Sequence, residues 1–128
     1  MAPEGNQRKG HICLLDDDPS VLRATGRLLS SAGWTVESFT EPYTFLSYAH
    51  QHRPRCVVID ISMPVMNGLE VQRLLRDISP GTRVYILTSK DDHATRTAAL
   101  NAGAAGFFLK PVAPEEFLAS LESALVES

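Results

Sequence analysis

Long hydrophobic runs are absent from the 128-residue sequence: none approaches the roughly 18 apolar residues that cross a bilayer. The first ten residues carry basic side chains with no apolar stretch behind them, so no secretory signal is expected. Cysteine is scarce, and its two occurrences, Cys13 and Cys56, both lie inside short apolar segments. One buried disulfide or two free thiols fit this placement, and a reducing compartment favours the thiols. We therefore expect a cytoplasmic domain with no membrane contact.

An excess of positive charge is also missing. Twelve basic residues stand against fifteen acidic ones, for a net charge of −3, which argues against direct nucleic-acid binding. Apolar residues make up 44% of the chain and charged residues 21%, a balance that excludes disorder and suits one globular domain. Residues 1–10 are polar and contain glycine, proline and asparagine, so they are expected to form a flexible leader to a domain over residues 11–126.

Four short apolar runs are continuous rather than alternating, which is typical of parallel strands buried on both faces. They lie at residues 12–15, 56–59, 84–87 and 107–109. A fifth segment, residues 35–39, alternates apolar and polar residues and is therefore expected to be an edge strand.

Helical patterns follow each of these strands. They are expected over residues 19–32, 42–52, 69–78 and 92–102, and from 114 to about 125. Asp18 before Pro19 is typical of a helix cap followed by proline at the first helical position. Five strand–helix repeats predict a three-layer α/β sandwich, in which a five-stranded parallel sheet of order 2-1-3-4-5 lies between five helices, a flavodoxin-like arrangement.

Polar side chains follow four of the predicted strands directly. These are the three aspartates at 16–18, then Asp60, then Thr88 with Ser89, and finally Lys110. Any one of them could simply terminate a strand. Sheets of this order bind ligands beyond the carboxyl ends of their strands, however, so the four together predict a site there.

The residue types at this site indicate phosphoryl transfer. Crowded carboxylates repel one another unless a cation compensates, and a set of oxygen ligands without histidine or cysteine suits Mg²⁺. The Lys110 ammonium and the Thr88 hydroxyl can both bind phosphoryl oxygens. A carboxylate in the same place can act as the covalent acceptor.

These motifs resemble the CheY-like receiver domain of bacterial two-component response regulators, from about His11 to about Leu125. The resemblance is carried by Leu15-Asp16-Asp17-Asp18-Pro19, Ile59-Asp60-Ile61-Ser62-Met63-Pro64-Val65-Met66-Asn67-Gly68, Leu87-Thr88-Ser89 and Leu109-Lys110-Pro111. The opening and the Phe107-to-Pro111 ending further resemble regulators that carry a helix-turn-helix output domain.

The resemblance implies a role for each site residue. Asp60 would be the phosphoacceptor. Asp17 would bind Mg²⁺ directly and Asp16 mainly through water, while Asp60 and the main-chain carbonyl of Ser62 would complete the protein ligands.

Further implied roles concern the phosphoryl group and the switch. Thr88 and Lys110 would hold the phosphoryl oxygens, and the peptide bond between Lys110 and Pro111 is expected to be cis. Phe107 stands at the aromatic switch position, where many receivers have tyrosine. Lacking a hydroxyl, its ring is expected to populate the inward position even without phosphorylation.

The function expected from this resemblance is a phosphorelay switch. A sensor histidine kinase or phosphotransfer protein would phosphorylate Asp60, altering the surface formed by residues 92–102, 107–109 and the last helix. Many relatives use this surface for dimerisation, so a phosphorylation-dependent homodimer is expected. The domain would assist its own phosphorylation and dephosphorylation rather than act as an enzyme on a separate substrate.

Two other functions compete with this switch. A binding module that has lost phosphorylation is disfavoured because the acidic residues, Thr88 and Lys110 are all retained. An aspartyl phosphohydrolase would need a carboxylate two residues past the nucleophile, where Ser62 stands, and a cap domain for which the chain has no room.

Two apolar features are assigned to packing or left open. Trp34 is expected to pack or to anchor a surface rather than to bind a ligand. Residues 63–66 are expected to expose apolar side chains beside the site, either as loose packing or as a docking patch for the kinase.

Overall fold

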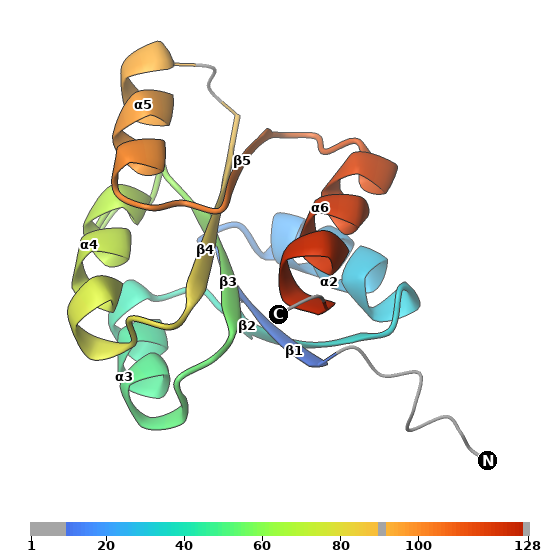
Figure 1. Ribbon diagram of the computed structural model, residues 1–128, viewed down its shortest axis with the longest axis horizontal. Coiled ribbons are helices and arrows are strands. Elements are labelled where there is room, and N and C mark those ends of the chain that lie inside the picture. The colour runs from blue at the N-terminus through green and yellow to red at the C-terminus, as the bar shows by residue number, and fades with distance from the viewer. Residues whose placement is uncertain (1–9, 90–91, 127–128) are drawn as a thin grey trace.

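The computed structural model describes residues 10–89 and 92–126, in which strands and helices alternate along the chain (Figure 1). The strands are β1 (Gly10–Leu15), β2 (Trp34–Phe39), β3 (Cys56–Asp60), β4 (Arg83–Thr88) and β5 (Gly106–Leu109). The helices are α2 (Pro19–Ser31), α3 (Pro42–His52), α4 (Gly68–Ile78), α5 (His93–Asn101) and α6 (Pro114–Val126). All strand pairs are parallel, in the order β2-β1-β3-β4-β5, which confirms the predicted topology.

The sheet lies between two helical layers. Helices α3, α4 and α5 cover one face, and α2 and α6 cover the other (Figure 1). Successive β1 residues pack alternately into the two layers, Cys13 and Leu15 on the α3–α4–α5 face and Ile12 and Leu14 on the opposite face. This double burial is the reason that the strand reads as a continuous apolar run.

The two cysteines are buried as free thiols, as favoured from the sequence. They belong to the cores on opposite faces of the sheet. Burial raises the pKa of Cys13 to about 12 and, by the same cause, raises that of Cys56. Both thiols therefore stay protonated and chemically quiet near neutral pH.

One burial prediction is wrong. The run at 107–109 was expected to be buried on both faces, but Phe107 and Phe108 are only half-buried and Leu109 is 37% exposed. The reason is the sheet order, which makes β5 the second edge strand and leaves it with one neighbour, β4. At the other edge, Trp34 begins β2 and is buried in the core, so it packs as expected.

The caps of the helices fix the loops at the carboxyl end of the sheet. The Asp18 side chain accepts a hydrogen bond from the backbone N–H of Ser20 at 2.9 Å, which confirms its role as a cap. Asn67 accepts from the N–H of Glu70 at 3.0 Å and so begins α4. In α5, whose residues are all described, only Ala99 is buried, in keeping with its alanine-rich sequence.

Gly10, placed in the expected leader, belongs to β1, and residues 1–9 of that leader lie outside the described residues. Within the described ranges, no helix is long and apolar enough to cross a membrane.

Candidate functional site

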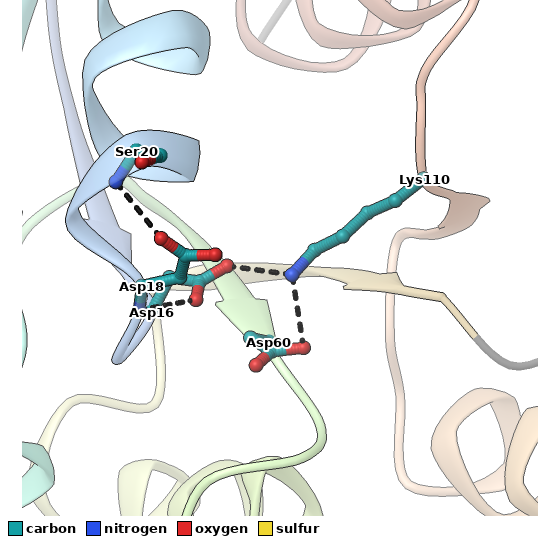
Figure 2. A network of polar contacts seen from close by, with 5 residues as sticks. All are labelled: Asp16, Asp18, Ser20, Asp60 and Lys110. Carbon is teal, nitrogen blue, oxygen red and sulfur yellow. Dashed lines mark hydrogen bonds and ion pairs between the residues drawn. The ribbon is translucent and has the colours of Figure 1, made fainter.

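The carboxyl ends of four strands bring the predicted polar residues together. Asp16 follows β1, Asp60 ends β3, Thr88 ends β4 and Lys110 follows β5. Figure 2 shows the Lys110 side chain reaching across from the segment after β5 to the two aspartates. Its Nζ lies 2.8 Å from Asp16 Oδ2 and 3.4 Å from Asp60 Oδ1.

The aspartates form an acidic group that could hold a cation. One oxygen each from Asp16, Asp17 and Asp60 lies within 4.8 Å of the others. Asp16 and Asp60 are only 4% and 5% exposed, whereas Asp17 is exposed at the rim. An all-oxygen set of this kind fits a hard divalent cation such as Mg²⁺, which commonly binds one or two carboxylates and keeps several waters.

Backbone hydrogen bonds hold Asp16 in place. Its N–H donates to the carbonyl of Phe39 at the end of β2, at 3.1 Å. Its Oδ1 accepts from the N–H of Asp18 at 2.9 Å, so the turn between β1 and α2 orients the carboxylate (Figure 2). The other oxygen, Oδ2, is left to pair with Lys110.

The loop after Asp60 is wrapped tightly against the end of β3. The N–H groups of Met63 and Gly68 both donate to the carbonyl of Ile61, at 3.2 and 3.0 Å. A Cβ at Gly68 would lie only 2.6 Å from the carbonyl oxygen of Asp60. Asn67-Gly68 is a common turn former, and in this loop the missing side chain of Gly68 is what permits the close approach.

The charges at the site perturb one another. Burial and the neighbouring charge of Asp16 raise the pKa of Asp60, although Lys110 and the Ser62 N–H act in the opposite direction. Burial would lower the pKa of Lys110, but its hydrogen bond to Asp16 and the charges of both aspartates outweigh burial and raise it. Lys110 is therefore a fixed cation among carboxylates that one lysine does not fully neutralise.

Ser62, Thr88 and Lys110 are linked to this group through the backbone. The N–H of exposed Ser62 donates to the Asp60 carboxylate, which places this residue beside the acidic group. Thr88 is 1% exposed, and its carbonyl accepts from the N–H of Lys110 at 2.8 Å. The bond between Lys110 and Pro111 is cis, as predicted.

Phe107 lies on β5 beside α5. Its ring packs against the α3–α4–α5 core. The Arg96 guanidinium lies over the ring in a cation–π contact, 4.7 Å from the ring centroid. Arg96 was not identified from the sequence, because only the fold brings residues eleven apart on a helix and a strand into contact. The population of the inward ring stays a prediction.

The apolar segment after the site is mostly packing. Met63 and Met66 are each only 8% exposed and belong to the core, whereas Val65 is 59% exposed. The expectation of an exposed apolar patch over residues 63–66 is therefore wrong for both methionines. The tight loop turns them inward, which a linear pattern does not show.

Comparisons with known proteins agree with this geometry. Residues 12–122 match the family model described as response regulator receiver domain. The chain is 35% identical over 120 residues to the response regulator protein TodT of Pseudomonas putida, covering 94% of this chain and 53% of TodT. It is 38% identical over 114 residues to the response regulator MprA of Mycobacterium sp. strain KMS, covering 89% of this chain and 50% of MprA.

A solved structure gives the same result for the fold. The crystal structure of a CheY-like receiver domain protein from Methanospirillum hungatei superposes with a TM-score of 0.86 at 27% identity, over 92% of this chain and 94% of that one. The chain spans about half the length of the two curated relatives. By its family match, its relatives and its fold, the chain belongs to the response regulator receiver domain family.

Proposed function

We propose that this domain is a phosphorylation-controlled switch in which Asp60 accepts a phosphoryl group from a sensor histidine kinase or a phosphotransfer protein. The observation that carries the proposal is the buried Asp60 carboxylate at the end of the central strand, with the Lys110 ammonium 3.4 Å away. A carboxylate in this position is a nucleophile already facing a cation that can bind the incoming phosphoryl oxygens.

The transfer step uses the chain's own residues in distinct roles. A carboxylate oxygen of Asp60 forms a bond to phosphorus as the N–P bond of the partner's phosphohistidine breaks. The bonding pair stays on the imidazole nitrogen, which then takes up a proton. Lys110 holds the phosphoryl oxygens by charge, and the Thr88 hydroxyl donates to one of them.

The acidic group is the proposed Mg²⁺ site, with Asp16, Asp17, Asp60 and the main-chain carbonyl of Ser62 as its protein ligands. A bound Mg²⁺ ion would supply positive charge against the phosphoryl oxygens. The mutual distance of the aspartate oxygens, within 4.8 Å, supports this assignment. The chemistry of an all-oxygen donor set supports it as well.

The proposed output is a change in the surface formed by α5, β5 and α6. Movement of Thr88 toward a phosphoryl oxygen would let Phe107 swing further inward, with α5 following. We propose that this surface then forms a homodimer or contacts an output domain. The matching segment is about half of TodT and of MprA, which supports a switch that controls a further domain. A helix-turn-helix output domain is what the resemblance of the sequence motifs implies.

In this proposal the domain acts on no separate substrate, and its place is the cytoplasm. The two free thiols support a reducing compartment. A pure binding module is the second candidate, and phosphoryl uptake separates the two.

The test is intact-mass measurement after incubation with acetyl phosphate, with Mg²⁺ or with a chelator. Wild type is expected to gain one phosphoryl group with Mg²⁺ only, and Asp60→Asn to gain none. Asp17→Ala is expected to lose Mg²⁺ affinity. Equal uptake by Asp60→Asn, or no uptake by wild type, would contradict the proposed function.

The proposed signal route has its own measurement, the amide chemical shifts of residues 92–110 with and without beryllofluoride. Thr88→Ala is expected to abolish the response in α5, while Phe107→Tyr is expected to move the resting ring outward. An unchanged response in Thr88→Ala would place the route elsewhere.

A further inference from the structure

A polar cavity of about 320 Å³ lies at the opposite end of the sheet from Asp60. It is bounded by the last turns of α4 and α5 and by the start of β4. The polar residues in its lining are Gln72, Arg76, Ser79, Thr82 and Asn101. None of these residues takes part in the site described above.

Gln72 is an unusual residue in this lining because it is a buried amide that is only half satisfied. It is 1% exposed, and its Nε2 donates to the carbonyl of Ala99 in α5 at 3.0 Å. Its Oε1 has no hydrogen-bond partner among the described residues. Buried carbonyl oxygens are nearly always paired, so an unpaired one beside a cavity indicates a missing donor.

The cavity has negative helix ends and one positive side chain, Arg76, in its lining. Helices α4 and α5 end there, at Ile78 and Asn101, and the C-terminus of a helix carries partial negative charge. Arg76 is exposed, and among residues 10–89 and 92–126 no ion pair or hydrogen bond engages its guanidinium.

The remaining hydroxyl groups of the lining are already used. Ser79 and Thr82 share a hydrogen bond of 2.6 Å, and Thr82 also donates to the carbonyl of Pro54. The lining groups left without a hydrogen bond among the described residues are therefore Gln72 Oε1, the exposed Asn101 amide and the Arg76 guanidinium.

We propose that this cavity binds a small zwitterion of the α-amino-acid type. The ligand's ammonium would donate to Gln72 Oε1, close to the negative C-terminal ends of α4 and α5, and its carboxylate would pair with Arg76. A bound ligand of this kind satisfies the orphaned amide oxygen and the unpaired guanidinium together. A simple amine or a simple acid satisfies only one of them.

Occupation of the cavity would reach α5 directly. The carbonyl of Ala99 in α5 accepts two hydrogen bonds. One comes from Gln72 Nε2, and the other comes from the N–H of Ala104, just after the end of α5. Ala99 is also the buried side chain of that helix. Fixing the Gln72 amide therefore fixes the C-terminal end of α5, and the consequence for signalling rests on the proposed function.

The test is a nitrogen-15 NMR titration of the whole, unphosphorylated chain with each of the twenty protein amino acids in turn. At least one is expected to cause saturable shifts in the Gln72 side-chain amide and in residues 79–82 and 101–104. The amine and the carboxylic acid that match that amino acid, each carrying one of its charged groups, are expected to bind at least about tenfold more weakly. Absence of saturable shifts with all twenty would overturn the proposal.

Variants assign the binding to these residues. Arg76→Gln and Gln72→Met are each expected to weaken binding about tenfold or more, while Arg73→Gln, an exposed residue on the same helix, is expected to leave it unchanged. If Gln72→Met does not fold, Arg76→Gln alone tests the assignment. An unchanged affinity of Arg76→Gln for the amino acid would refute it. Asp60→Asn is expected to retain binding, so failure here and failure of the phosphorylation switch are separate results.

Discussion

Removal of the charge at Asp60 is expected to stabilise the folded domain. The substitution is Asp60→Asn, which keeps the size of the side chain and one acceptor oxygen for the Ser62 N–H or Lys110. The negative charge is lost, and an NH2 group replaces the second oxygen. Lys110 then keeps Asp16, at 2.8 Å, as its partner.

The magnitude follows from the distances at the site. At an effective dielectric constant of about 20, the Lys110–Asp60 attraction at 3.4 Å is worth about 5 kcal/mol. Repulsion from Asp16, with an oxygen within 4.8 Å, offsets at least about 3.5 kcal/mol of that. Burial of the carboxylate outweighs the small remainder, in agreement with its raised pKa. We expect Asp60→Asn to be more stable than wild type by about 1–2 kcal/mol at pH 7 without divalent cation.

The assay is urea unfolding, followed by the fluorescence of Trp34, the single and buried tryptophan of the chain. The difference should depend on pH, because the pKa of Asp60 is higher in the folded than in the unfolded state. Wild type therefore gains stability relative to Asp60→Asn as the pH falls through the raised pKa. The difference should vanish below the ordinary value of 3.8.

Two controls make the result specific. Glu37→Gln removes one negative charge from an exposed position on β2, and its stability is expected to change by less than about 0.5 kcal/mol. Added Mg²⁺ should stabilise wild type more than Asp60→Asn, because binding to the folded state alone raises its stability. If Asp60→Asn is no more stable than wild type at pH 7, or if the gain persists unchanged below pH 3.8, the account of this charge group is wrong.

Three further substitutions test the surrounding structure. Lys110→Met leaves the two buried carboxylates without their cation and is expected to cost about 2 kcal/mol in urea unfolding at pH 7. The cost should fall at lower pH, because Asp60, whose pKa is raised, becomes protonated. Gly68→Ala places a methyl group 2.6 Å from the carbonyl oxygen of Asp60 and is expected to lower the free energy of unfolding by more than about 2 kcal/mol in the same assay. Gly81→Ala is the control, because nothing lies within 4 Å of the added methyl group, and its stability should hardly change. Asn67→Ala removes the cap of α4 and is expected to lower stability by about 1 kcal/mol, measured by thermal unfolding.

Most of the fold was predictable because local signals and global position agree. Strands buried on both faces are continuous apolar runs, and their ends are marked by the first polar residue. Asp16, Asp60 and Lys110 each stand directly after or at the end of such a run, so the sheet order was enough to bring them together.

The errors share one physical cause, which is that burial depends on neighbours distant in sequence. Phe107 and Phe108 have the composition of an interior strand, yet β5 has a neighbour on one side only. Met63 and Met66 lie in a loop whose hydrogen bonds to Ile61 turn them into the core. Neither result follows from residue type or spacing.

The sequence could not predict which aspartate Lys110 pairs with more closely, and this pairing bears on how the switch would work. In this state the ammonium is closer to Asp16 than to Asp60, at 2.8 against 3.4 Å, so a phosphoryl group on Asp60 would compete with Asp16 for it. The N–H of Lys110 is held by the carbonyl of Thr88, so a shift of the lysine toward Asp60 would draw on the ends of β4 and β5 together. Those strand ends carry Thr88 and lead back to Phe107, whose ring lies beneath Arg96 of α5. Helix α5, of which only Ala99 is buried, is thus linked to the charge at Asp60 through Lys110, the end of β4 and the Phe107–Arg96 contact.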